Sequence, residues 1–298
     1  MTASSKIIDI KVVKPRVLVY PDITYAQPYD PYFGISSLKL DIFKPEVKKN
    51  NLPLVIYIPG GGFMRSPKVN YLQQKVAIAE AGFIVASIEY RVLPTSKFPD
   101  SLVDIKSAIR FLKAHAEEFN INKNKIIVMG ESAGGYLAAI TGTTNGFIEF
   151  DKGDYLNENS LINGVIDLYG ISDLTKIASD FSLSIQKTHN SPSAPEALFL
   201  NGVAVFKEGG SVSSDPEKVK KSNPMSYIST NTPPFLLMHG DSDILVSPSE
   251  TDILYQALIK HGIKAERYLI KGVGHGDYHW CQPEIINIII NFLNETLK

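Results

Sequence analysis

The sequence predicts an α/β domain built on a mostly parallel sheet that is covered by helices on both faces. Short apolar runs rich in β-branched residues alternate with longer amphipathic stretches, which is the order of strand and helix in such folds. The composition is that of a folded protein, with 44% hydrophobic and 20% charged residues. A chain of 298 residues can bury a large core, so we expect residues 1–298 to form one domain.

The N-terminal part of the chain follows a different pattern from the rest. Residues 7–13, 17–25 and 38–43 carry short or alternating apolar runs with no helical stretch between them. Parallel neighbours need a long crossover connection, whereas antiparallel strands do not. We therefore expect these three segments to be antiparallel strands at one edge of the sheet.

From residue 54 onward, strand and helix patterns alternate. The strands are predicted at residues 54–58, 83–89, 125–129, 161–168, 234–238 and 265–270, and the helices at residues 70–81, 102–119, 132–141, 250–260 and 284–297. Gly82 and Gly262 follow two of these helices, at the position where glycine commonly ends a helix. The apolar residues of 102–119 recur at steps of three and four, which predicts one long helix.

The alternation stops between residues 171 and 222. This stretch contains Ser, Pro, Gly and Lys in irregular order, which indicates an inserted cap or a long loop. Its large apolar side chains either line a substrate pocket or pack the insertion onto the core. They are Phe181, Leu198, Phe199, Leu200, Val203 and Phe206.

The charge balance and the apolar runs exclude several classes of protein. The chain has 30 Lys and Arg against 31 Asp and Glu, so it lacks the basic excess of a nucleic-acid-binding protein. Cys281 is the only cysteine, which excludes an internal disulfide and a zinc site made of several cysteines. No stretch is long and apolar enough to span a bilayer, and no secretory signal is visible. We expect a cytoplasmic protein that acts on a small molecule, and the sequence leaves homo-oligomer formation open.

The strongest candidate for chemistry is the G-x-S-x-G sequence at residues 130–134, which lies between a predicted strand and a predicted helix. In this context the serine sits on a sharp turn that exposes its hydroxyl, and the small neighbours prevent clashes. The helix that follows directs its N-terminus at the hydroxyl and favours negative charge there. We therefore interpret Ser132 as a nucleophile.

A serine hydroxyl needs a base, and the base needs an orienting acid. Both follow Ser132 in the order acid, then histidine, directly after predicted strands. Asp243 is the preferred acid and Asp241 is the alternative. Asp241 is better explained as a residue that braces the turn through its own backbone, as aspartate commonly does. His275 lies between glycines and is the preferred base, with His279 as the competitor. The remaining histidines are interpreted as structural or surface residues: His239 at a strand end, and His115, His189 and His261 on helices or the surface.

A second element is Pro59-Gly60-Gly61-Gly62-Phe63, directly after the strand predicted at residues 54–58. A glycine run lets backbone N–H groups turn toward an anion without obstruction by side chains. We assign the N–H groups of Gly61, Gly62 and Ala133 to the oxyanion that forms during acyl transfer.

These stretches together resemble the α/β-hydrolase fold, and within it the esterases with a His-Gly-Gly-Gly loop. The resemblance is closest to the BD-FAE-like esterases, of the acetylxylan and feruloyl esterase type, with the hormone-sensitive-lipase group as a neighbour. It covers residues from about 35 to the end of the chain. The matching stretches are residues 58–63, 89–94 with Phe98-Pro99, 130–135, 222–227, 233–240 with Asp243, and 271–275. Pro59 stands where the family has the histidine of its glycine loop.

The resemblance implies Ser132 as nucleophile, His275 as base and Asp243 as acid. It favours Asp243 over Asp241 because the family acid is the fifth residue of a His-Gly-x-x-Asp run, which here begins at His239. The implied activity is a serine carboxylesterase that cleaves short-chain, acetyl or hydroxycinnamoyl esters and needs neither a metal nor an organic cofactor. Two alternatives stay open, a serine peptidase of the prolyl-oligopeptidase kind and a non-catalytic binding protein on the same fold.

Overall fold

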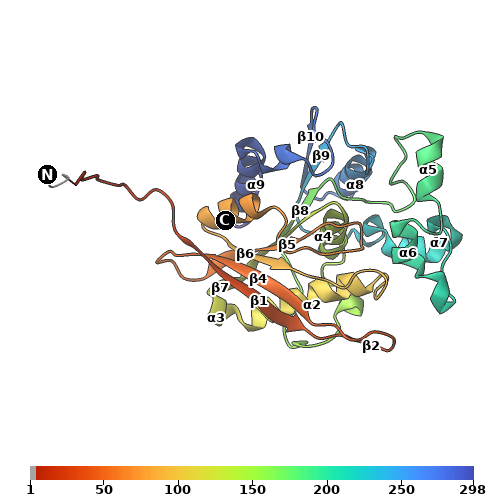
Figure 1. The fold of residues 1–298 in the computed structure, drawn as a ribbon, viewed down its shortest axis with the longest axis horizontal. Helices are drawn as coiled ribbons and strands as arrows, with labels where there is room; N and C mark the ends of the chain where they lie inside the picture. The colour runs from red at the N-terminus through yellow and green to blue at the C-terminus, as the bar shows by residue number, and fades with distance from the viewer. Residues whose placement is uncertain (1–4) are drawn as a thin grey trace.

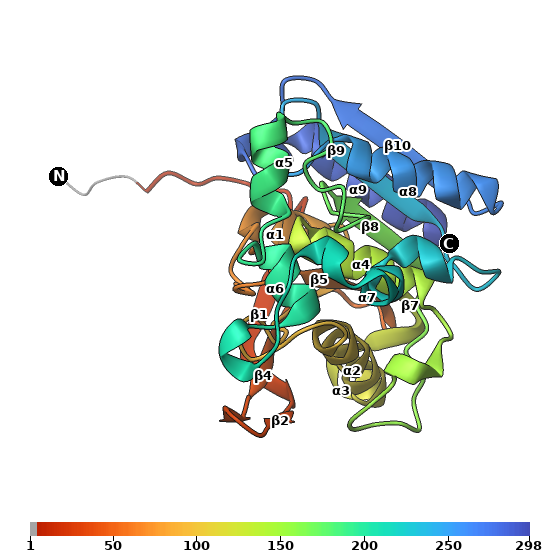
Figure 2. The ribbon, with the colours of Figure 1, turned by 90° about the vertical axis from the view of Figure 1, so that its right-hand side faces the viewer.

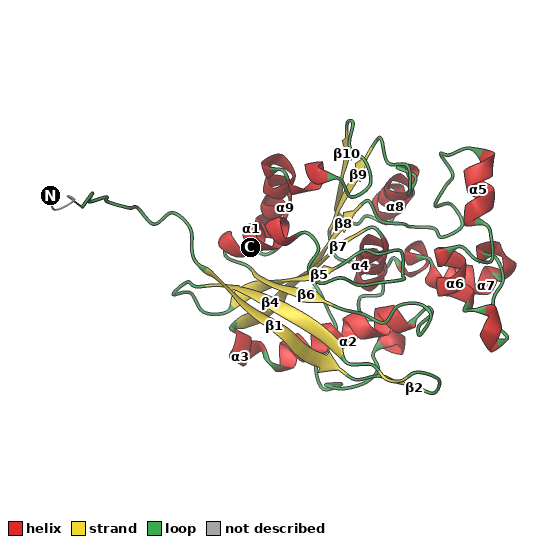
Figure 3. Cartoon of the chain, in the orientation of Figure 1, coloured by secondary structure: helices red, strands yellow, loops and turns green. Residues whose placement is uncertain are grey.

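The structure, a computed structural model, describes residues 5–298 (Figures 1 and 3). The strands are β1 (Val17–Ala26), β2 (Tyr29–Asp30), β3 (Gly34–Ile35), β4 (Leu38–Pro45), β5 (Leu52–Ile58), β6 (Ile84–Ile88), β7 (Ile121–Glu131), β8 (Gly164–Leu168), β9 (Phe235–Gly240) and β10 (Ala265–Ile270). The α-helices are α1 (Leu72–Glu80), α2 (Asp100–Ala114), α3 (Ala116–Phe119), α4 (Ala133–Thr143), α5 (Leu183–His189), α6 (Pro195–Asn201), α7 (Pro216–Ser222), α8 (Ser249–Lys260) and α9 (Pro283–Thr296).

Within residues 5–298, eight strands form one sheet in the order β1-β4-β6-β5-β7-β8-β9-β10. The strands from β6 to β10 run parallel, whereas β1 and β4 pair antiparallel at one edge. Every residue of β6, β8 and β9 is buried, as expected for parallel strands that are covered on both faces. The predicted fold class, a mostly parallel α/β sheet of the α/β-hydrolase type, is confirmed.

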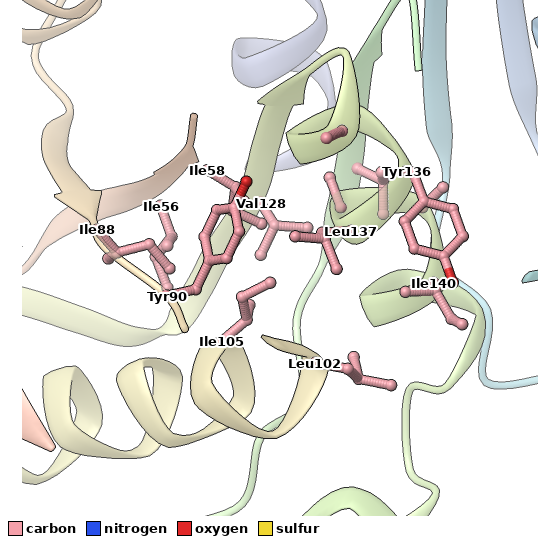
Figure 4. Packing of buried hydrophobic residues seen from close by; sticks show 14 of the residues in the cluster. Ile56, Ile58, Ile88, Tyr90, Leu102, Ile105, Val128, Tyr136, Leu137 and Ile140 are labelled. Atoms are coloured by element: carbon pink, nitrogen blue, oxygen red, sulfur yellow. The ribbon is translucent and has the colours of Figure 1, made fainter. Parts of the chain in front are cut away.

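Helices cover the two faces of the sheet in separate groups. Apolar residues of α1 and α9 pack on one face, and those of α2, α4 and α8 pack on the other (Figure 3). Figure 4 shows part of the second group, in which Ile105 of α2 and Leu137 of α4 approach strand residues such as Ile56. This packing fixes the carboxyl ends of the central strands, and the loops that follow them, relative to one another.

Two local expectations were wrong. Residues 7–13 form no strand, and their large apolar side chains are exposed, up to 96% at Ile7, because the chain brings no partner strand beside them. The helix expected at residues 102–119 is divided at His115, where φ is −102° and α2 ends before α3. The ring of His115 also hydrogen-bonds the Phe111 carbonyl, at 2.9 Å. The strands expected at residues 17–25 and 38–43 are present as β1 and β4.

The segment 171–222, expected to be irregular, contains three short α-helices and two 3-10 helices (Ala204–Phe206 and Val212–Ser214). Figures 1 and 2 show α5, α6 and α7 gathered at one side of the molecule. No residue of α5 is buried, whereas α6 buries Phe199 and Leu200 against the core. No helix within residues 5–298 is long and apolar enough to cross a membrane.

Candidate active site

Ser132 lies at the turn between β7 and α4. Its backbone has φ 56° and ψ −123°, a conformation that costs about 1–3 kcal/mol for a residue other than glycine. The surrounding packing imposes this turn, because a Cβ on Gly130 would strike the Gly134 carbonyl and a Cβ on Gly134 would strike the Ile58 carbonyl. Ser132 itself is half-buried and borders a pocket. The two glycines of the motif therefore allow the close packing that raises the serine above the sheet.

The structure brings Ser132, His275 and Asp243 together from three separate strand ends. His275 Nε2 lies 2.8 Å from Ser132 Oγ, and its Nδ1 lies 2.7 Å from Asp243 Oδ2. A carboxylate only accepts hydrogen bonds, so Nδ1 carries the proton that faces Asp243. The Nε2 lone pair is then free to accept the Ser132 proton, which is the tautomer that a general base requires.

Asp243 is held in place by more than His275. Its Oδ1 accepts the N–H groups of Leu245 and Val246, and its Oδ2 also lies 3.2 Å from His239 Nε2. Burial disfavours the charge, but hydrogen bonds from His239 and His275 outweigh it and hold the pKa of Asp243 well below its usual range. Asp243 is therefore ionised at neutral pH and can stabilise an imidazolium at position 275.

The alternative acid and base have other partners. Asp241 Oδ1 accepts the Gly272 N–H and the Ser242 hydroxyl, so Asp241 braces two loops against each other. The His279 ring lies 2.9 Å from Asp277 Oδ1 and stacks on Tyr278. Within residues 5–298, neither Asp241 nor His279 forms a hydrogen bond or ion pair with Ser132 or His275. The geometry therefore favours Asp243 and His275.

Two aromatic side chains fix the loop that carries His275. The fully buried Trp280 donates its Nε1–H to the Gly274 carbonyl at 2.9 Å, so it anchors the loop rather than lining the pocket. Tyr169 packs edge-on against the His275 ring, with the ring centroids 4.8 Å apart. Its hydroxyl is 2.6 Å from that of Tyr71. Sequence reasoning missed Tyr169 because nothing in its local pattern marks it.

The glycine loop after β5 lies beside Ser132. Gly61 has φ 140° and Gly62 has φ 61°, values that a side chain rarely permits. Within residues 5–298, the N–H groups of Gly61 and Gly62 donate no hydrogen bond, and both residues line the pocket of Ser132 together with Ala133. Free N–H groups beside a nucleophile are suited to bind a developing oxyanion.

The loop is braced although Pro59 replaces the histidine expected there. The Tyr90 hydroxyl donates to the Pro59 carbonyl at 2.7 Å, and Glu131 Oε1 accepts the Gly60 N–H at 2.7 Å. The Leu93 N–H donates to the Phe63 carbonyl at 2.9 Å. Burial raises the pKa of Glu131 to about 7, against the effect of the Gly60 N–H. Sequence reasoning missed both Tyr90 and Glu131 as braces of this loop.

The pocket above Ser132 has a volume of ≈ 620 Å³. The glycine loop, the turn at Ser132 and the loop after Asp243 form most of its wall. His275 and Asn70 also line it, together with five residues of the segment 171–222, namely Ile171, Ile177, His189, Pro195 and Glu196. His189 was expected to be a surface or helix residue. It is the last residue of α5, and it also borders this pocket.

None of the six apolar candidates of the segment 171–222 lines this pocket. Phe199 and Leu200 are buried in the core, and Phe181 packs against it.

Within residues 5–298, no group of three or more His, Cys, Asp or Glu side chains could hold a metal ion.

This chain is similar to known esterases in both sequence and structure. Residues 40–258 match the model of the family described as BD-FAE. A solved structure, the truncated form of a carbohydrate esterase from gut microbiota, superimposes with a TM-score of 0.80 at 25% sequence identity. The match covers 94% of this chain and 96% of that one.

Two curated relatives are similar over most of this chain. Esterase LipC of Mycobacterium tuberculosis is 25% identical over 241 residues, which are 80% of this chain and 56% of LipC. The probable isoprenylcysteine alpha-carbonyl methylesterase ICMEL1 of Arabidopsis thaliana is 28% identical over 248 residues, which are 82% of this chain and 50% of that protein. The chain therefore spans about half the length of these relatives.

Proposed function

Because this chain belongs to the BD-FAE family of α/β-hydrolase esterases, we propose that it hydrolyses carboxylic esters through a covalent serine intermediate. One observation carries the proposal. His275 Nε2 lies 2.8 Å from Ser132 Oγ while its Nδ1 lies 2.7 Å from the buried Asp243. This is the hydrogen-bonded order of nucleophile, base and orienting acid that acyl transfer by serine requires.

In the proposed first half-reaction, Ser132 Oγ attacks the ester carbonyl while His275 Nε2 takes the hydroxyl proton. The carbonyl oxygen becomes an oxyanion, which the N–H groups of Gly61, Gly62 and Ala133 bind. Asp243 stabilises the imidazolium of His275. The C–O bond to the alcohol then breaks, and the alcohol leaves with the proton from His275.

In the second half-reaction, His275 takes a proton from water, and the resulting hydroxide attacks the acyl-serine carbonyl. The same N–H groups bind the second oxyanion. His275 then returns the proton to Ser132 Oγ as the acid is released. Each proton that leaves a nucleophile is thus received by the same imidazole, and no cofactor takes part.

We further propose that residues 171–222 act as a cap and that the substrates are short-chain, acetyl or hydroxycinnamoyl esters. A pocket of ≈ 620 Å³ that opens at Ser132 has room for an acyl group of this size. The structural neighbour described as a carbohydrate esterase supports an acylated sugar as the source of such esters.

The test has two parts. A fluorophosphonate probe should label the native chain and leave the Ser132→Ala variant unlabelled, with the two circular-dichroism spectra alike. A panel of p-nitrophenyl esters from acetate to octanoate, methyl ferulate, acetylated xylan and an aminopeptidase substrate then gives the acyl preference. Failure of the native chain to label or to cleave any ester would refute the proposal, and preferential cleavage of the peptide substrate would point to a peptidase.

A further inference from the structure

Two cavities meet at the C-terminal end of α5. One is the Ser132 pocket, and the other, which we name the α5 cavity, has a volume of ≈ 420 Å³. It is lined by residues 174–179, by side chains of α5, and by Asn190, Val212 and Ser213. Ile177 and His189 line both cavities, so these two side chains stand where one cavity adjoins the other.

His189 is held in a defined orientation by a buried carboxylate. Its Nδ1 lies 2.5 Å from Oε1 of Glu196, whose side chain is only 3% exposed. The carboxylate accepts, so Nδ1 carries the proton that faces Glu196. Within residues 5–298, His189 Nε2 has no hydrogen-bond partner. The free nitrogen can therefore form a hydrogen bond with a hydroxyl group that enters either cavity.

The α5 cavity differs from a packing defect of the core. A core void is lined by apolar atoms, whereas this cavity also presents the side chains of Gln186, Asn190 and Ser213. Asn190 Oδ1 accepts the Ser213 hydroxyl, at 2.7 Å, which leaves the Asn190 amide protons available. Leu174 and Leu183 supply apolar surface beside them. Lys176 and Lys187 also line the cavity, so every polar side chain there can donate hydrogen bonds. Apolar surface interrupted by such groups suits a ligand with ring faces and hydroxyl groups.

We propose that His189, oriented by Glu196, binds a hydroxyl-bearing part of the ester substrate remote from the reacting carbonyl, and that this part extends into the α5 cavity. The inference rests on the proposed esterase function and adds a second subsite to it. His189 is a substrate-binding residue in this account, and Glu196 is a positioning residue that acts through it.

The experiment compares two acetate esters that differ in length. p-Nitrophenyl acetate is small enough to occupy the Ser132 pocket alone, whereas an acetylated xylotriose also reaches the α5 cavity. For His189→Ala we expect kcat/KM to fall roughly 10-fold or more with the acetylated xylotriose, mainly through KM, which is the usual loss for one hydrogen bond in a binding site. With p-nitrophenyl acetate the fall should be clearly smaller, because this ester carries no hydroxyl group for His189 to bind.

Three further variants separate binding from a structural role. His189→Gln keeps a hydrogen-bond acceptor and should restore part of the affinity for the xylotriose ester. Ser213→Trp places a large side chain in the α5 cavity and should raise KM for the same substrate alone. Thr188→Ala is the matched control, because Thr188 is exposed on α5 and lines neither cavity.

The outcomes distinguish this inference from the proposed function. Equal losses on both substrates in His189→Ala would make the pair with Glu196 a structural contact and would overturn the inference. Unchanged kinetics on both, or a native chain that cleaves p-nitrophenyl acetate but not the xylotriose ester, would also overturn it. In each of these cases the native chain is an esterase, whereas the absence of any ester cleavage by the native chain would remove the proposed function itself.

Discussion

The proposed catalytic centre and the segment 171–222 border the same pocket, but they are held in different ways. Ser132, His275 and Asp243 follow strands of the central sheet and are joined by hydrogen bonds of 2.7 and 2.8 Å. In contrast, α5 has no buried residue, and its end contacts the rest of the segment through the pair His189–Glu196. A buried sheet can hold reacting atoms to a fraction of an ångström, whereas a loosely packed helix tolerates substitution.

This difference indicates that acyl transfer and recognition of the rest of the substrate are divided between the two regions. Acyl transfer needs fixed distances, because misplacement by about 1 Å can reduce a rate about 100-fold. Recognition of the rest of a substrate needs shape and a few hydrogen bonds, which a helix at the edge of the fold can supply. We therefore expect changes in the centre to act on kcat and changes in α5 to act on KM.

The largest expected effect is that of Asp243→Asn. An asparagine can donate to His275 Nδ1 and so favours the tautomer in which Nε2 carries the proton and cannot accept one from Ser132. We expect kcat for p-nitrophenyl acetate to fall about 10,000-fold, as it does for the equivalent change in a well-studied serine protease. Steady-state kinetics with the folded state checked by circular dichroism measures this.

The neighbouring aspartate provides the matched control. Asp241→Asn should change kcat by only a few-fold, because Asp241 accepts from Gly272 and Ser242 and does not contact His275. If the two variants lose activity to the same extent, or if Asp241→Asn is the worse, the acid has been assigned to the wrong residue.

The next largest effect is expected at Phe199, a residue of the segment 171–222 that packs directly on the glycine loop of the proposed catalytic centre. Phe199 of α6 is 1% exposed and stacks on Phe63 of the glycine loop, with ring centroids 4.0 Å apart. We expect Phe199→Ala to lower the free energy of unfolding by about 3–5 kcal/mol, through lost contacts and the cavity left behind. Urea denaturation measures it, and Val205→Ala, at a residue 81% exposed, should stay within about 0.5 kcal/mol of the native chain. A Phe199→Ala effect below about 1 kcal/mol would contradict this anchoring role.

Much of the geometry of the proposed catalytic centre could be predicted because its signals are local. The turn at Ser132 needs glycines at 130 and 134, since neighbouring backbone leaves no room for a Cβ, and those glycines are visible in the sequence. The parallel strands are equally visible, because burial on both faces requires uninterrupted apolar runs.

The features that were missed depend on segments that meet only in the folded chain. Tyr90 and Glu131 brace the glycine loop from two other parts of the sequence. His189 reaches the pocket because α5 ends there, and no motif surrounds it. The strand expected at residues 7–13 failed for the same reason, since an alternating pattern does not guarantee a partner strand.

A third prediction concerns the point where the segment 171–222 begins. Glu250 Oε2 accepts the N–H groups of Ser172 and Asp173, at 2.7 and 2.8 Å, and burial raises the pKa of Glu250 from 4.5 to about 8. Between pH 4.5 and 8 the unfolded chain therefore releases a proton that the folded chain keeps, so this group lowers stability as pH rises. Glu250→Gln removes the titration, and its stability relative to the native chain should increase by a few kcal/mol between pH 5 and pH 8.

Urea denaturation of both proteins at several pH values measures this difference. Glu284→Gln, at an exposed position on α9, should follow the native chain throughout. A constant difference between Glu250→Gln and the native chain across this range would mean that Glu250 keeps the same charge in the folded and unfolded states. The start of the segment would then be anchored by a permanently ionised carboxylate.

The smallest expected effect tests whether the rigidity of the centre extends to its glycine loop. Glu131→Ala removes the acceptor of the Gly60 N–H and should let the loop shift, so that Gly61 and Gly62 meet the oxyanion less well. We expect kcat for p-nitrophenyl acetate to fall roughly 10- to 100-fold with little change in KM, because the loss falls on the transition state. Glu131→Gln keeps an acceptor oxygen and should retain most of the activity. Equal losses in the two variants would instead assign the effect to the charge of Glu131, and the glycine loop would then be held by Tyr90 and the Leu93 N–H without it.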